Sequence, residues 1–170
     1  MKRNFKDSIA QPISSLNLLF FRGIRGPEAI LMARPEEIEE EAVKRVCTLA
    51  RHSNVPLIID HPTSQSAIEV IRNQKEKGQV VIGQASVISM AVNGSEYYNE
   101  NWNKSAALVT SPPLRDDPEV QEVIVEAALQ DVYATVCSNH KAYTNEVKKS
   151  LGKHDFSKIP QGNNSKFLID

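Results

Sequence analysis

The chain has 170 residues, which is enough for one domain with a sizeable hydrophobic core. Hydrophobic residues make up 41% of it and charged residues 24%, as is typical of soluble globular proteins. The 20 basic and 21 acidic residues nearly cancel, to a formal charge of -1. Because neither sign dominates, the composition indicates neither a nucleic-acid surface nor a polybasic patch for membranes.

Residues 1–21 are predicted to be an atypical, poorly ordered leader, followed by a single domain at 22–170. The apolar run Leu16–Phe21 is too short for a membrane span and is interrupted by Asn17. The leader also lacks the small-residue cleavage site of a signal peptide. We therefore expect no membrane association.

The two cysteines, Cys47 and Cys137, lie far apart and lack the spacing of a metal-binding motif. We interpret both as free, buried thiols in a reducing compartment, which favours a cytoplasmic location. A disulfide between them is the alternative.

The first predicted helix begins at Arg34–Pro35 and ends before His52. Proline at the first helical position loses no hydrogen bond, because the N–H there would have no partner within the helix. Glutamates crowd the first turns, between Glu36 and Glu41, where the helix dipole favours negative charge. We interpret this acidic run as a solvated helix start. A short apolar strand, Pro56–Asp60, is predicted to follow.

Thr63 or Ser64 is predicted to cap the next helix, which ends at Lys77–Gly78. Asn93–Gly94 marks a turn further along. The remaining expected elements are strands at 79–83 and 131–136 and helices at 99–108, 118–129 and 144–151. Short apolar strands separated by helices are typical of the α/β class, with a parallel sheet covered by helices.

Six segments carry a resemblance to a known family: Ala33–Val43, Pro56–Ser66, Gly94–Tyr98, Trp102–Lys104, Thr110–Pro118 and Leu151–Gly162. In order and spacing they resemble the dihydropyrimidinase and collapsin-response-mediator family of cyclic amidohydrolases. The similarity runs from Gly23 to Gly162, over more than four-fifths of the chain.

The resemblance implies a partial (β/α)8 amidohydrolase barrel that contains only the later strands, with a parallel sheet and flanking helices. Enzymes of the family hydrolyse the small cyclic amides of dihydropyrimidines and hydantoins, using two zinc ions that activate a bridging hydroxide. The chain lacks counterparts of the early His-x-His strand and of the segment with the bridging lysine. We therefore expect a truncated chain that does not retain the zinc ions.

Two positions decide what the resemblance implies for catalysis. His61 falls where the family places a zinc-binding histidine, at the carboxyl end of a strand. The alternative is a strand-end histidine that forms only local hydrogen bonds. Asn139 takes the position of the family's catalytic aspartate, and its neutral amide cannot accept a proton and is a weaker zinc ligand. We therefore predict that this chain is catalytically inactive.

Two further positions match substrate contacts of the family. Ser111 matches a residue whose backbone contacts the substrate ring, although a rigid loop held by Pro112 and Pro113 is the alternative. Gln161 stands where the enzymes have a substrate-contacting asparagine. Arg115, in contrast, resembles the enzyme branch rather than the mediators.

The predicted function is therefore that of a truncated, inactive member of the dihydropyrimidinase family. A non-catalytic scaffold like the collapsin response mediators is the main alternative, and a gene fragment without a function of its own is a third. Half a barrel would expose parallel strand edges, which invite pairing with other chains. We expect homo-oligomers, hetero-oligomers with family members, or poor solubility.

Overall fold

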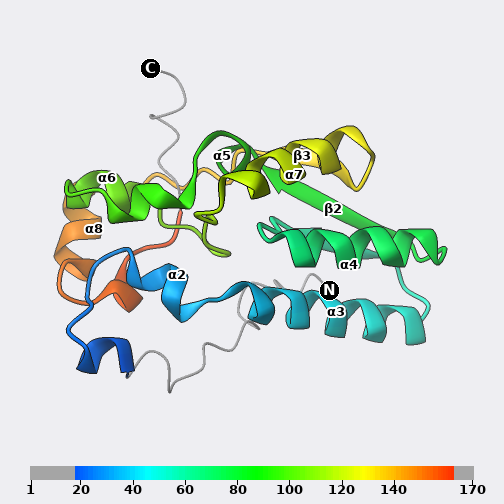
Figure 1. Cartoon of the computed structure of the whole chain (residues 1–170), viewed down its shortest axis with the longest axis horizontal. Helices are drawn as coiled ribbons and strands as arrows, with labels where there is room; N and C mark the ends of the chain where they lie inside the picture. The colour runs from blue at the N-terminus through cyan, green and yellow to red at the C-terminus, as the bar shows by residue number, and fades with distance from the viewer. Residues whose placement is uncertain (1–17, 163–170) are drawn as a thin grey trace.

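The computed structural model describes residues 18–162 and contains a three-stranded parallel sheet (Figure 1). Its strands, β1 (Leu57–Asp60), β2 (Val81–Ser86) and β3 (Tyr133–Cys137), lie in the order β1-β2-β3. These strands run parallel, because helical segments lead from the end of one strand back to the start of the next. The predicted parallel sheet with flanking helices is confirmed.

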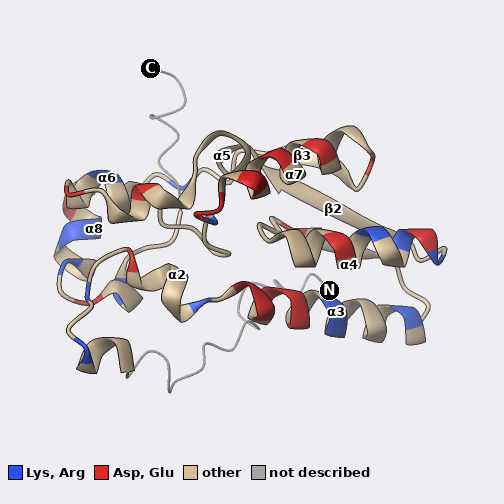
Figure 2. Ribbon diagram, viewed as in Figure 1, with Lys and Arg blue, Asp and Glu red and all other residues tan. Residues whose placement is uncertain are grey.

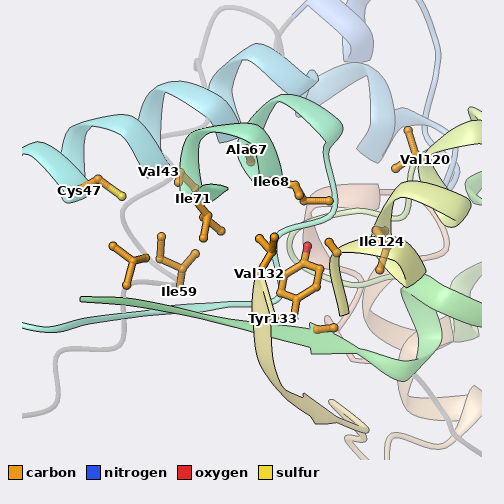
Figure 3. Packing of buried hydrophobic residues seen from close by; sticks show 13 residues of the cluster. Val43, Cys47, Ile59, Ala67, Ile68, Ile71, Val120, Ile124, Val132 and Tyr133 are labelled. Atoms are coloured by element: carbon orange, nitrogen blue, oxygen red, sulfur yellow. The ribbon is translucent and has the colours of Figure 1, made fainter. Parts of the chain in front are cut away.

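Three long helices cover one face of this sheet. They are α3 (Glu36–His52), α4 (Gln65–Glu76) and α7 (Pro118–Leu129). Their apolar sides pack on inward-facing residues of the strands, as Figure 3 shows for Val43, Ile71 and Ile59. Side chains alternate along a strand, so Ile59 is buried here while its neighbour Ile58 is 62% exposed on the other face.

The helices α4 and α7 each begin directly after a residue whose side chain caps the helix. The Ser64 hydroxyl accepts the N–H of Ala67 at the start of α4, and the Asp117 carboxylate accepts the N–H of Glu119 in α7. Figure 2 shows acidic residues at the start of α3 and basic ones toward its end, the arrangement that the helix dipole favours.

β2 begins two residues later than predicted. Gly78 has a positive φ of 79°, and the N–H of Gln79 still bonds back to the carbonyl oxygen of Gln74. Gln79 therefore belongs to the end of α4, in the manner of a glycine-terminated helix. Strand pairing starts where Val81 aligns with Leu57.

A second hydrophobic cluster lies beyond the sheet, among short helices. These are α2 (Ala29–Ala33), α5 (Val87–Ala91), η2 (Gly94–Tyr98), α6 (Trp102–Ala107), α8 (Asn145–Gly152) and η3 (Phe156–Lys158). The sequence predicted α6 and α8 but neither α2, α5 nor the two 3-10 helices. Helices of three to five residues carry too little hydrophobic periodicity to be distinguished from loops.

The predicted leader falls mostly outside the described residues, which begin at residue 18. Residues 18–21 form a helical turn. Leu19 in this turn is buried in the second cluster, and the ring of Phe20 stacks on Phe156 with 5.1 Å between centroids. In residues 18–162, no helix has both the length and the apolar character needed to cross a membrane.

Two burial predictions were wrong. Glu39, in the acidic run interpreted as solvated, is only 3% exposed because it binds partners from two other segments. Cys137 is half-buried rather than buried, since it ends an edge strand. Cys47 is buried, and the two cysteines remain thiols rather than a disulfide.

Candidate functional site

His61 lies directly after the last residue of β1, at the carboxyl end of the sheet. Its backbone takes a left-handed conformation with φ of 56°, and its N–H donates to the carbonyl oxygen of Gln84 at 2.8 Å. The side chain is 6% exposed, and its Nδ1 lies 3.3 Å from the Sγ of Cys137 at the end of β3. The structure thus joins two residues that lie 76 positions apart in the sequence.

β3, which ends at Cys137, pairs with β2 through an irregular register. The register between β2 and β3 shifts after Gly83, so that Gly83 pairs with Tyr133 and Gln84 with Thr135. Such an irregularity bends a strand and redirects its side chains, and it often occurs beside functional sites. A Cβ at Gly83 would lie 2.7 Å from the Tyr133 ring, so glycine is required for this close packing.

Tyr133 ties β3 to the segment after β1. Its hydroxyl donates to the carbonyl oxygen of Pro62 at 2.9 Å, and Figure 3 shows the ring inside the core between strands and helices. Burial, with a smaller effect of the Glu39 charge, raises the pKa of Tyr133. The phenol therefore stays neutral and remains a donor at physiological pH.

Glu39 holds the same segment from the helix side. Its Oε1 accepts the N–H of Thr63 at 2.6 Å, and its Oε2 accepts from the guanidinium of Arg115 at 2.6 Å. Arg115 also donates to the carbonyl oxygen of Arg34 at 2.7 Å. The Thr63 hydroxyl donates to the carbonyl oxygen of Pro113 at 2.8 Å. One buried ion pair therefore fixes both the segment after β1 and the Pro112–Pro113 turn.

Tyr97 holds the same turn through its hydroxyl group. Its hydroxyl accepts the N–H of Leu114 at 3.1 Å and donates to the carbonyl oxygen of Leu108 at 3.2 Å. The Asn93–Gly94 turn lies against it, because the N–H of Gly94 donates to the carbonyl oxygen of Arg115 at 2.7 Å. A side chain at Gly94 would collide with the backbone of Leu114.

Ser111, Asn139 and Gln161, which are far apart in sequence, line one small cavity together with Lys141 and Gly162. Its volume of about 20 Å³ is enough for about one water molecule, whereas small-molecule pockets typically have roughly 300–1,000 Å³. His61 is not among the lining residues. It is linked to the cavity through Cys137, two residues before Asn139.

The Gln161–Gly162 side of the cavity is held by a buried lysine that the sequence did not indicate. Lys148 in α8 is 1% exposed and donates to the carbonyl oxygens of Ala106 at 2.7 Å, Ala107 at 3.3 Å and Gly162 at 2.7 Å. The N–H of Gly162 also donates to the carbonyl oxygen of Val109 at 2.7 Å. Burial lowers the pKa of Lys148 to about 8.

Two larger hollows lie away from this end of the strands. One of about 210 Å³ lies beside the start of β2, where Val55, Pro56 and Val80 line it. The other, of about 350 Å³, lies between α5 and α6 and is lined by Val92, Asn93 and Leu108 among others. Neither is lined by His61, Ser111, Asn139 or Gln161, the predicted site residues.

The chain is similar in sequence to dihydropyrimidinases and to their relatives. It is 41% identical over 147 residues to dihydropyrimidinase 2 of Caenorhabditis elegans, a match that covers 86% of this chain and 28% of that protein. It is 39% identical over 140 residues to human dihydropyrimidinase-related protein 5, covering 82% of this chain and 25% of that one. The chain belongs to the dihydropyrimidinase family. It spans about a quarter of the length of these two relatives.

The structural comparison agrees with this family. The solved structure of D-hydantoinase from Bacillus sp. AR9 matches with a TM-score of 0.84 and 30% identity, over 89% of this chain and 33% of that one. The predicted partial amidohydrolase fold is thereby confirmed. No family model matches the chain.

The residues present do not fit the two-zinc centre that the family resemblance implied. In residues 18–162, no three or more histidine, cysteine, aspartate or glutamate side chains come together in a way that could hold a metal ion. Asn139, which is predicted to stand at the position of the family's aspartate, has an amide that is a weaker ligand than a carboxylate. The role of His61 as a zinc ligand stays a prediction. The roles of Ser111 and Gln161 as substrate contacts also stay predictions.

Proposed function

We propose that this chain is a non-catalytic member of the dihydropyrimidinase family, which does not hydrolyse cyclic amides. Asn139 carries the proposal. It lines the same small cavity as Ser111 and Gln161, the two predicted substrate-contacting residues, and this supports its assignment to the position of the family's catalytic aspartate. A neutral amide cannot accept a proton, whereas a carboxylate can.

The test is a hydrolysis assay with dihydrouracil and hydantoin at saturating zinc, alongside the zinc content of the dialysed protein. We expect no ring opening by the unaltered chain or by an Asn139→Asp variant, because one restored carboxylate does not supply the other zinc ligands. Turnover by the unaltered chain, or two tightly held zinc ions per chain, would contradict the proposal.

We further propose that the protein acts through association, either with itself or with other members of the family. The sheet of the described residues has β1 and β3 at its edges, and apolar side chains on them are exposed, Ile58 at 62% and Val136 at 51%. Open strand edges with exposed apolar side chains favour pairing with another chain. The two separate thiols suit a reducing compartment, and we place this association in the cytoplasm.

Light scattering coupled to size-exclusion chromatography tests the association. We expect oligomers or aggregates in the unaltered chain, and an Ile58→Lys variant that shifts toward monomer. The matched control is Leu129→Lys, since Leu129 is 82% exposed but lies at the end of α7, away from the strand edges. A monodisperse monomer with a sharp unfolding transition would overturn this proposal.

A further inference from the structure

The hollow of about 350 Å³ between α5 and α6 combines an apolar lining with two charged side chains. Ala91, Val92 and Leu108 provide the apolar part. Glu96 in η2 and Lys104 in α6 add one charge of each sign. The volume falls within the roughly 300–1,000 Å³ of typical ligand pockets. The hollow therefore suits an apolar group that is flanked by opposite charges.

The two charged side chains of the hollow are not neutralised by each other or by a neighbour. Both Glu96 and Lys104 are exposed, and in residues 18–162 neither takes part in a salt bridge. One carboxylate oxygen of Glu96 accepts from the side-chain amide of Asn99 at 3.2 Å, which orients the carboxylate without neutralising it. Charges of both signs beside apolar surface favour a partner with the complementary pattern.

The sequence contains a segment with this complementary pattern shortly after the described residues. Phe167, Leu168 and Ile169 are three consecutive large apolar residues, and Lys166 and Asp170 flank them with opposite charges. Apolar side chains gain free energy when they leave water for an apolar surface.

We propose that the hollow is the docking site of the segment 166–170 of the same chain. The apolar side chains of the segment lie against the apolar lining, Lys166 pairs with Glu96, and Asp170 pairs with Lys104. Attraction at both ends fixes the direction in which the segment binds. The inference does not rest on the proposed function, since it involves neither catalysis nor the strand edges.

The described part of the chain leads to the hollow. The N–H of Gly162 donates to the carbonyl oxygen of Val109 at 2.7 Å, and Val109 directly follows Leu108, which lines the hollow. Lys148 holds the carbonyl oxygen of Gly162 at 2.7 Å. Phe167 comes five residues after Gly162, a span of at most about 18 Å in an extended chain. Because the segment is tethered beside its site, even a weak contact is populated.

The other cavities do not match this segment. Arg51 and Lys77 line the hollow of about 210 Å³, and no acidic residue is among its lining residues, so it would repel Lys166. The cavity beside Gln161 has about 20 Å³, which is too small for a large apolar side chain. Charge and size together therefore select the hollow between α5 and α6.

The experiment is a cycle of charge reversals in the full chain, measured by the melting temperature. Lys104→Glu and Asp170→Lys should each lower it by about 1–3 °C, as expected for an exposed ion pair. The double variant should recover most of the loss, because it restores the pair with reversed signs. Lys77→Glu is the matched control, since Lys77 lines the other hollow, and its effect should simply add to that of Asp170→Lys.

A second measurement follows the segment directly, through trypsin cleavage after Lys166 read by mass spectrometry. We expect Phe167→Ser to be cleaved there about fivefold faster than the unaltered chain, because cleavage follows the undocked population. Cleavage after the exposed Lys158 is the internal reference. Leu49→Ser, which removes a side chain that is 61% exposed on α3, should leave the rate after Lys166 unchanged.

Three outcomes would overturn the inference. The first is that the effects of Lys104→Glu and Asp170→Lys add without recovery, and the second is that Phe167→Ser is cleaved as slowly as the unaltered chain. The third is protection of Lys166 that disappears on dilution, since the segment would then bind a second copy. The proposed function fails separately, on cyclic-amide turnover or on a monodisperse monomer.

Discussion

The segment after β1 and the Gln161–Gly162 segment are both held by a buried charged side chain, but the two charges are compensated differently. Glu39 faces the guanidinium of Arg115 and receives the N–H of Thr63. Lys148 donates to three backbone carbonyl oxygens. An ion pair compensates most of the desolvation of each charge, whereas carbonyl dipoles compensate a buried ammonium less completely. The first segment should therefore depend strongly on its charges, and the second should respond to pH.

The largest expected effect is that of breaking the ion pair. Glu39→Gln leaves Arg115 as a buried cation without its counter-charge, so we expect the free energy of unfolding to fall by about 3–5 kcal/mol. Urea denaturation followed by circular dichroism measures this. Glu37→Gln, on the exposed side of the same helix turn, is the control and should change the value by less than about 0.5 kcal/mol. Equal effects of the two variants would show that the buried pair contributes little.

A smaller effect is expected from removing the lysine. Lys148→Met leaves the carbonyl oxygens of Ala106, Ala107 and Gly162 without this donor, which should cost about 1–3 kcal/mol. Removing the ammonium of Lys148 also removes the free-energy cost of desolvating its charge, which offsets part of this loss of stability. Lys149→Met, an exposed neighbour in α8, is the matched control for urea denaturation. A Lys148→Met variant more stable than the unaltered chain would mean that desolvation outweighs the three hydrogen bonds.

The pH dependence of stability should distinguish the Gln161–Gly162 segment, which Lys148 holds, from the segment after β1, which the ion pair holds. The folded chain holds the pKa of Lys148 near 8, below its ordinary value of 10.5. Between pH 8 and pH 10.5, Lys148 binds more protons in the unfolded chain than in the folded chain, so its contribution to stability rises with pH. This contribution is lost as the pH falls through about 8. The difference in melting temperature between the unaltered chain and Lys148→Met should therefore grow from pH 8 to pH 10. A constant difference across this range would contradict the lowered pKa.

The smallest expected effect concerns a neutral hydrogen bond in the β1-end segment. Tyr133→Phe removes the donor to Pro62 and keeps the ring against Gly83, so we expect a loss of about 0.5–1.5 kcal/mol. Thermal unfolding is the measurement, and Tyr143→Phe, in the loop before α8, is the control. A loss as large as that of Glu39→Gln would place the main support of this segment on Tyr133 instead of the ion pair.

Much of the regular structure could be predicted because it depends on local signals. α7 has the bounds 118–129 that the sequence predicted, since Asp117 caps it, Pro118 opens it and its apolar residues repeat at helical spacing. Glu39 could also have been recognised as buried. It lies three and four residues before Ala42 and Val43, and therefore on the apolar side of α3, where the structure buries all three.

The burial of Lys148 could not be recognised from the spacing of apolar residues in this way. In α8 the apolar side chains of Val147 and Leu151 are 41% and 53% exposed, while Lys148 and Gly152 are buried. The hydrophobic pattern thus indicates the wrong face. Gly152 lies directly against Ile159 and Lys148 reaches carbonyl oxygens of α6, so the orientation of this helix is set by close backbone packing and hydrogen bonds.

The sequence by itself determined the class of fold, the parallel order of strands and helices, and the family, because these follow from periodicity, caps and motif order. It also placed His61 at the end of a strand. Only the tertiary structure decided which of these residues meet. Cys137 lies against His61, and Ser111, Asn139 and Gln161 share a cavity. Tyr97, Arg115 and Lys148 hold the segments that carry Ser111 and Gln161. Contacts between residues far apart in the chain depend on packing and buried polar bonds, which no local pattern encodes.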